Sequence, residues 1–113
     1  MNPAKMLLAA VMLFPEALEE AVGLGVTEAD FFDAGDRQIW RAISVVRDEG
    51  TGVDYVTVGR ALLSADMADL AYAVGIIFDA DDLPANTDLR AQVPTLVASL
   101  RDIRRAARRK AAQ

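Results

Sequence analysis

Apolar residues recur at intervals of three and four along most of this chain, which is the period of an amphipathic α-helix. Pro15 ends the first such series, and its fixed backbone angle suits the first position of a second helix over residues 16–22. Gly23 and Gly25 then predict a turn. The first helix is expected to be packed on most of its circumference, through Met6, Leu7, Ala10, Val11, Leu13 and Phe14.

Capping residues and a glycine mark the next two predicted helices. Thr27 followed by Asp30 is a variant of the capping box and predicts a short helix carrying Phe31 and Phe32, both in the core. A longer helix is predicted over about 35–49, because Gly50 stands where helices commonly end. Its buried side is expected to hold Ile39, Trp40, Ala42, Ile43 and Val46.

Residues 51–58 contain enough β-branched side chains to suit a strand. A helix is favoured, because a single strand would have no partner elsewhere in the chain and Asp54 is a good helix cap. Its inward positions are expected to be Val56, Val58, Leu62 and Leu63. A further helix is predicted over about 67–78, with Leu70, Val74, Ile77 and Phe78 inward.

A long final helix is predicted over about 86–110, with Asn86 as its cap and Pro94 kinking its first turns. Its apolar residues follow a seven-residue repeat, which makes a narrow seam for packing against another helix. This seam has to lie on the chain's own head or on a second copy, and a homodimer is predicted. The seam consists of Leu89, Val93, Leu96, Leu100 and Ile103, with Ala107 next in the series.

The pattern as a whole predicts an all-α fold in a single domain over residues 1–113. A compact multi-helix head over about 1–83 is followed by the long helix. The length suits one core and leaves no room for a second, catalytic domain. The apolar run at 6–14 is shorter than the roughly 20 residues that span a bilayer, so no membrane contact is expected. A signal peptide is disfavoured because Pro15 and Glu16 follow this run.

The sequence contains neither cysteine nor histidine. Disulfides, thiolate nucleophiles and the commonest metal ligand and general base are therefore excluded. The serines have no histidine to activate them, so the chain is not expected to be an enzyme, and no catalytic, cofactor-binding or metal-binding residues are predicted. Asp79, Asp81 and Asp82 form an acidic loop without the ordered ligand spacing of a calcium site, and exposure is expected.

Charge is unevenly distributed along the chain. Residues 1–100 carry 6 basic and 16 acidic side chains, a net charge of −10, whereas residues 101–113 carry 6 basic and 1 acidic, a net charge of +5. This basic tail suits contacts with nucleic-acid phosphates, but it also suits a helix end whose dipole favours cations, which we prefer because no aromatic is present for base stacking. The candidate phosphate contacts are Arg101, Arg104, Arg105, Arg108, Arg109 and Lys110.

Three short strings stand out by their order and separation: Asp30-Phe31-Phe32, then Asp36-Arg37-Gln38-Ile39-Trp40, then Gly50 running into Val53-Asp54-Tyr55-Val56-Thr57-Val58. Together they resemble the N-terminal domain of the DnaB-type replicative DNA helicase family. The stretch from Leu7 to Leu13 resembles the family's first helix, although Lys5 stands where an acidic residue is usual. Residues 71–74 depart from the family's pattern, so docking residues are not transferred.

The resemblance implies an all-helical head, a helical hairpin, self-pairing into a collar on a hexameric ring, and docking of primase. Helicase activity is not expected, because the chain has no Gly-x-x-x-x-Gly-Lys-Ser/Thr loop. The expected function is a cytoplasmic, non-catalytic module for protein–protein interaction and oligomerisation in DNA replication. Its expected partners are a second copy of itself and a replicative helicase, primase or helicase loader.

Several alternatives stay open at this point. The chain is an excised domain of a larger helicase, or a free-standing helical regulator, for example one encoded by a mobile element, that binds a host replication protein. The third account is a helical regulator unrelated to the family. Weak nucleic-acid binding through the basic C-terminal helix is a further possibility.

Overall fold

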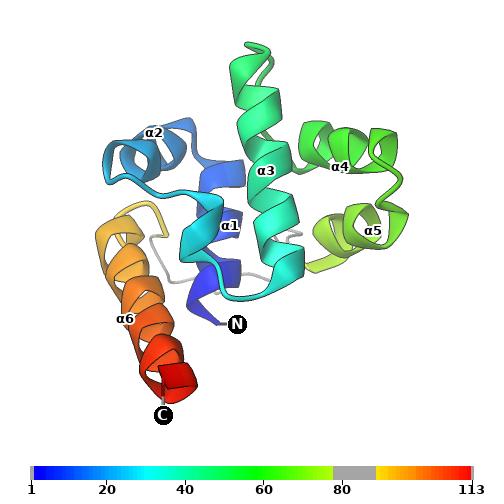
Figure 1. The fold of residues 1–113 in the computed structure, drawn as a ribbon. Coiled ribbons are helices and arrows are strands. Elements are labelled where there is room, and N and C mark those ends of the chain that lie inside the picture. Colours follow the sequence, from blue (N-terminus) through cyan, green and yellow to red (C-terminus); the bar gives the residue numbers. More distant parts are fainter. Residues whose placement is uncertain (1, 78–88, 113) are drawn as a thin grey trace.

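The computed structural model describes residues 2–77 and 89–112, and its regular elements in these ranges are all helical (Figure 1). The predicted all-α fold is confirmed. In chain order the elements are α1 (Pro3–Leu13), α2 (Pro15–Gly23), the 3-10 turn η1 (Glu28–Asp30), α3 (Ala34–Asp48), α4 (Tyr55–Ser64), α5 (Ala68–Ile77) and α6 (Val93–Ala112).

Helix α1 lies at the centre of the domain and packs against α2, α3 and α6. Residues 7–12 are buried in succession, as expected for a helix covered on most of its circumference. The Asn2 side chain caps α1 by accepting a hydrogen bond from the Lys5 backbone N–H at 2.9 Å. Pro15 opens α2 at its first position, as predicted.

The two phenylalanines after η1 have different environments. Phe31 is fully buried, and its ring centroid lies 5.5 Å from that of Trp40. Phe32 is 66% exposed, so the prediction that both rings lie in the core is wrong for Phe32. The reason is local: the chain is extended at Phe31, and successive side chains of an extended chain point to opposite sides.

Helices α3 and α4 have the caps that the sequence predicts. Gly50 follows α3 with a φ of 76°, a left-handed conformation that glycine adopts at little cost. The Asp54 side chain accepts hydrogen bonds from the backbone N–H groups of Val56 and Thr57 at 2.8 and 2.9 Å. Residues 55–58 are thus helical, which confirms the choice of helix over strand. The predicted buried residues of α3 are all buried: Ile39, Trp40, Ala42, Ile43 and Val46.

Only one face of α4 is covered by the rest of the domain. Val58 and Leu62 are buried, whereas Val56 and Leu63 are 48% and 56% exposed. The predicted inward position of Val56 and Leu63 is therefore wrong. The α-helix turns about 100° per residue, so Val56 lies about 160° around α4 from Val58 and cannot share its contact with α3.

The end of α5 and the start of the last helix fall partly outside the described residues. Val74 of α5 is buried as predicted, and Leu70 is half-buried. The side chain of Ile77, Phe78, the acidic residues at 79–82 and the predicted cap Asn86 lie outside the described part. Residues 89–92 form turns, and α6 begins at Val93. The helix therefore starts later than predicted, because Pro94 is tolerated in a first turn but not in a helix interior.

Candidate protein-interaction surfaces

The predicted seam of α6 lies mainly against the chain's own core. Leu89, Val93, Leu96 and Leu100 are each at most 5% exposed, and α6 packs along α1, α2 and η1. Ile103 is the exception, at 46% exposure. The heptad spacing allowed the seam to pack either on the chain's own head or on a second copy. These four residues pack on the chain's own head. Contact with a second copy would have to use other residues.

The buried carboxylate of Asp30 connects α6 to η1. Asp30 is 5% exposed, and its Oδ1 lies 3.1 Å from Arg104 Nη1 and 3.5 Å from Arg101 Nε. Its Oδ2 accepts a hydrogen bond from the Thr27 backbone N–H at 2.9 Å. One carboxylate therefore caps η1 and pairs with two cations from a helix more than 70 residues away in sequence.

The same two arginines also donate hydrogen bonds to backbone carbonyls of the head. Arg101 Nη2 lies 2.8 Å from the Leu24 oxygen, and Arg104 Nη1 lies 3.3 Å from the Ala29 oxygen. Their side chains are about a third exposed, at 35% and 33%. Arg101 and Arg104 therefore hold α6 on the head, where their charge is shared with Asp30 and is less available to phosphate groups than that of an unpaired arginine.

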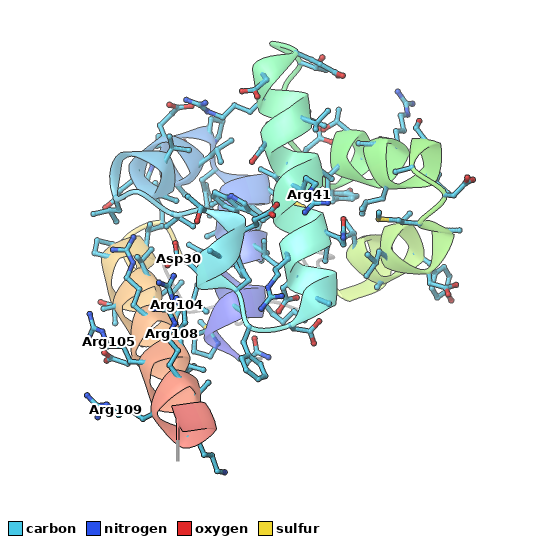
Figure 2. All side chains as sticks on the ribbon, viewed as in Figure 1. Asp30, Arg41, Arg104, Arg105, Arg108 and Arg109 are labelled. Atoms are coloured by element: carbon cyan, nitrogen blue, oxygen red, sulfur yellow. The ribbon has the colours of Figure 1, made fainter. Side chains whose placement is uncertain are left out.

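The remaining candidate phosphate contacts form an exposed basic end of α6, consisting of Arg105, Arg108, Arg109 and Lys110. Arg105 pairs with Asp102 on the same helix at 3.1 Å. Within residues 2–77 and 89–112, no ion pair includes Arg108, Arg109 or Lys110. The labelled arginines of this end lie along α6 as it extends away from the other helices (Figure 2).

On the side of α3 away from α6, helices α4 and α5 form a hairpin (Figure 1). A hollow of about 670 Å³ runs over the outer face of this hairpin, and we call it the α4–α5 groove. Four large apolar or aromatic side chains in it are exposed, with Leu63 at 56% and Tyr72 at 73%. The groove is lined by Tyr55, Val56, Gly59, Arg60, Leu63, Ala68, Asp69, Ala71, Tyr72 and Gly75.

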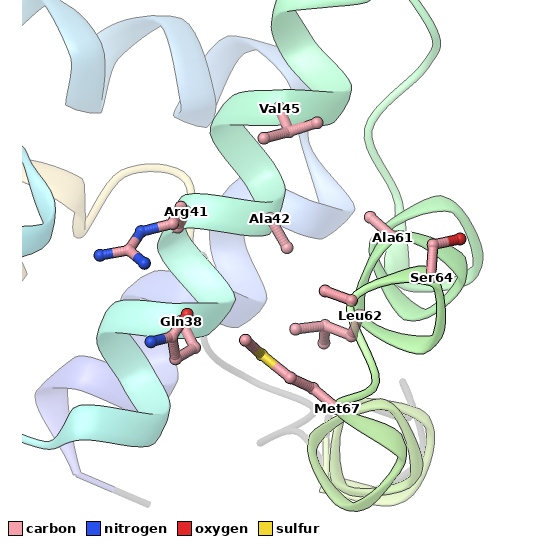
Figure 3. A pocket seen from close by; sticks show the side chains of 9 residues that line it. Gln38, Arg41, Ala42, Val45, Ala61, Leu62, Ser64 and Met67 are labelled. Carbon is pink, nitrogen blue, oxygen red and sulfur yellow. The ribbon is translucent and has the colours of Figure 1, made fainter.

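A second hollow, of about 370 Å³, lies between α3 and the hairpin (Figure 3). Its walls are mainly apolar, with Val45 46% exposed at the surface and Leu62 and Met67 from the hairpin. Arg41 also lines it, but its guanidinium donates two hydrogen bonds of 2.9 Å to the Glu28 carboxylate. The shape and lining suit an apolar side chain of a partner better than a charged ligand.

Surface ion pairs join the elements of the head. Arg47 of α3 lies 3.0 Å from Glu19 of α2, and the hydrogen bond to Arg47 holds the pKa of Glu19 below its usual value. The hydrogen bond to Arg41 lowers the pKa of Glu28 in the same way and raises that of Arg41. Both pairs lie at the surface, with only Arg47 half-buried, so each pair contributes little to stability. The shifts are those of structural pairs and do not identify an acid or a base for catalysis.

The described residues show no feature of a metal centre or a membrane span. No cluster of three or more acidic, histidine or cysteine side chains suited to a metal is present in residues 2–77 and 89–112. In the same ranges, none of the helices combines the length and apolar character needed to cross a bilayer. The apolar run at 6–14 corresponds instead to α1 and the residue after it, inside the core.

The described part of the chain is thus all-helical and has exposed apolar hollows on its surface, a feature that often marks interaction sites. The family model described as DnaB-like helicase N terminal domain matches residues 3–102. The chain therefore belongs to this family, which is that of a non-catalytic domain. The match runs from α1 into α6 and confirms the resemblance seen in the sequence. No curated protein and no solved structure matches the chain.

Proposed function

We propose that this chain is a cytoplasmic protein-association module of DNA replication, which pairs with itself and docks a replicative helicase, primase or helicase loader. The observation that carries the proposal is the family match over residues 3–102. A free-standing regulator that binds a host replication protein, for example one encoded by a mobile element, would have the same biochemistry.

The surface of the head supports association through apolar contacts. Single exposed apolar residues are common on soluble domains, but contiguous apolar patches usually mark interaction sites. Tyr55, Val56, Leu63 and Tyr72 are all at least 41% exposed and line one groove. Aromatic residues such as these tyrosines are enriched in the cores of protein–protein interfaces.

Docking is tested by titrating the chain with the purified replicative helicase, primase and loader of its source organism, each in a calorimeter. We expect saturable binding to at least one of them, with an affinity in the micromolar range or tighter. An unrelated hexameric ATPase provides the negative control. Absence of heat and of complex formation with all three replication proteins would contradict the docking half of the proposal.

Nucleic-acid binding is the second candidate function, because the basic end of α6 is exposed and three of its cations have no ion pair among the described residues. We expect at most weak binding of single-stranded DNA, weakening with salt by a logarithmic slope of about −0.7 for each phosphate contacted.

The test is fluorescence polarisation of the triple variant Arg105→Gln, Arg108→Gln, Arg109→Gln. Arg47→Gln is the control, since Arg47 lies on α3, away from α6, and is paired with Glu19. Arg101 and Arg104 are left unchanged because they hold α6 on the head. If the triple variant binds DNA as the unchanged chain does, or if binding is insensitive to salt, this second function is excluded.

A further inference from the structure

We infer that the α4–α5 groove is the surface through which two copies of this chain pair, in a two-fold arrangement with α4 of one copy over α5 of the other. The inference rests on the proposed function, in which the chain associates with itself, and adds the surface and the pairing that it uses. The buried seam of α6 cannot serve this purpose, because four of its five residues are already covered by the head.

The shape of the groove suits a helix as its occupant. On α4, Val56, Gly59 and Leu63 follow helical spacing along one face, as do Ala68, Tyr72 and Gly75 on α5. The large side chains form the walls, while the glycines keep the floor low. A Cβ atom added at Gly59 or Gly75 would meet nothing within 4 Å, so packing inside the chain does not require glycine there. Glycine at these positions would instead be required for the close approach of another helix.

The charges of the groove indicate that the helix that binds in it comes from a second copy of the chain. Arg60 on α4 and Asp69 on α5 are both exposed and line the groove. Within the described residues, neither belongs to an ion pair. In a two-fold contact each residue of a pair meets the other residue of the second copy. Two complementary Arg60–Asp69 pairs therefore form when α4 of each copy lies over α5 of the other.

The mixed charge also argues against nucleic acid as the occupant of the groove, because nucleic acid needs a basic surface.

The size of the groove sets the expected affinity of the pairing between two copies. Two helices of ten residues present a face of only about 15 by 20 Å, which is smaller than the roughly 800 Å² per partner in stable complexes. We therefore expect a concentration-dependent monomer–dimer equilibrium with a dissociation constant in the micromolar range or weaker, rather than a permanent dimer.

The inference is tested by sedimentation equilibrium of charge-reversed variants. Arg60→Asp and Asp69→Arg each place like charges opposite one another twice, so each variant alone should lose about tenfold or more in dimer affinity. A mixture of the two single variants should form a heterodimer, since each supplies the charge that the other lacks. The double variant should pair again for the same reason. Arg109→Asp, a charge reversal outside the groove, should leave dimerisation unchanged.

Gly75→Ala provides an independent check with two readouts of opposite sign. Alanine favours the helix, and the space around Gly75 is open in the single chain, so the melting temperature should rise. Dimer affinity should fall, because the new methyl group raises the floor of the groove. A merely structural role of this surface would change the first readout and not the second.

Two results would overturn the inference. Dimerisation of the unchanged chain with equal affinity in both single variants, or without rescue in their mixture and in the double variant, would place the contact elsewhere while leaving self-association intact. A monomer at every concentration would reject pairing through this groove, and the proposed function would then depend on the helicase, primase and loader titrations alone. The melting curve of each variant verifies that it remains folded.

Discussion

Replacing Phe31 by alanine is expected to remove a large part of the stability of this domain. Phe31 is fully buried, and its ring lies against that of Trp40 with centroids 5.5 Å apart. Truncating a buried phenylalanine typically costs about 3–5 kcal/mol, and a domain of this size has about 5–15 kcal/mol in total. Urea unfolding followed by tryptophan fluorescence measures the loss, since Trp40 is the chain's only tryptophan.

Phe32→Ala is the matched control, because it makes the same chemical change at the next position. Phe32 is 66% exposed, and surface substitutions usually change stability by no more than about 0.5 kcal/mol. The two variants should therefore differ by several kcal/mol. Equal losses in the two variants would contradict the structure, in which Phe31 is buried and Phe32 is exposed.

Replacing Asp30 by alanine is expected to loosen α6 from the head. The change removes the carboxylate that accepts a hydrogen bond from the Thr27 backbone N–H. It also leaves Arg101 and Arg104 without their shared counterion. Removing one partner of a fully buried ion pair costs about 3–5 kcal/mol, and we expect about 2–3 kcal/mol because the arginines are a third exposed and can be rehydrated. Thermal unfolding and amide hydrogen exchange along α6 measure the effect.

Asp102→Ala tests whether this loss is specific to the buried carboxylate. Asp102 pairs with Arg105 on the surface of the same helix, with the two side chains 73% and 66% exposed. Exposed pairs contribute at most about 1 kcal/mol, so exchange along α6 should change little. If Asp30→Ala left the exchange rates of α6 at their original values, Asp30 would not be what holds the helix on the head.

Several starts and ends of helices were well predicted because local chemistry sets them, whereas α6 starts later than expected, at Val93. Pro15 has a fixed φ, Gly50 tolerates a left-handed conformation, and the Asp54 side chain reaches the N–H groups of the next turn. Each of these effects depends on a few neighbouring residues that can be read directly from the chain. The choice of helix over strand at residues 55–58 was correct for that reason.

Which face of an element is covered was harder to predict. Apolar spacing shows that Val56 and Leu63 share a side of α4, but not that α3 covers the other side. The same applies to α6: the seam was recognised, while its contact with α1 depends on residues about 90 positions away. The available indication of the α4–α5 groove was the helical spacing of Val56, Gly59 and Leu63 on α4. Ala68, Tyr72 and Gly75 are spaced in the same manner on α5.

Only one of the two roles of Asp30 could be predicted from the sequence. Its place three residues after Thr27 predicted the cap, which the structure contains. Asp30 also forms ion pairs with Arg101 and Arg104, which lie 71 and 74 residues further along the chain. The sequence spacing does not predict such a contact. The basic tail was therefore treated as one uniform group, although two of its arginines hold the fold together and the others extend along the exposed end of α6.

The most direct test of self-association is the solution mass of the unchanged chain, measured by light scattering over a concentration range of about 10 μM to 1 mM, which brackets a weak dissociation constant. We predict a mass that rises with concentration from that of one 12.2 kDa chain towards that of two or more. A mass that stays at one chain throughout this range would contradict the claim that this domain associates with itself.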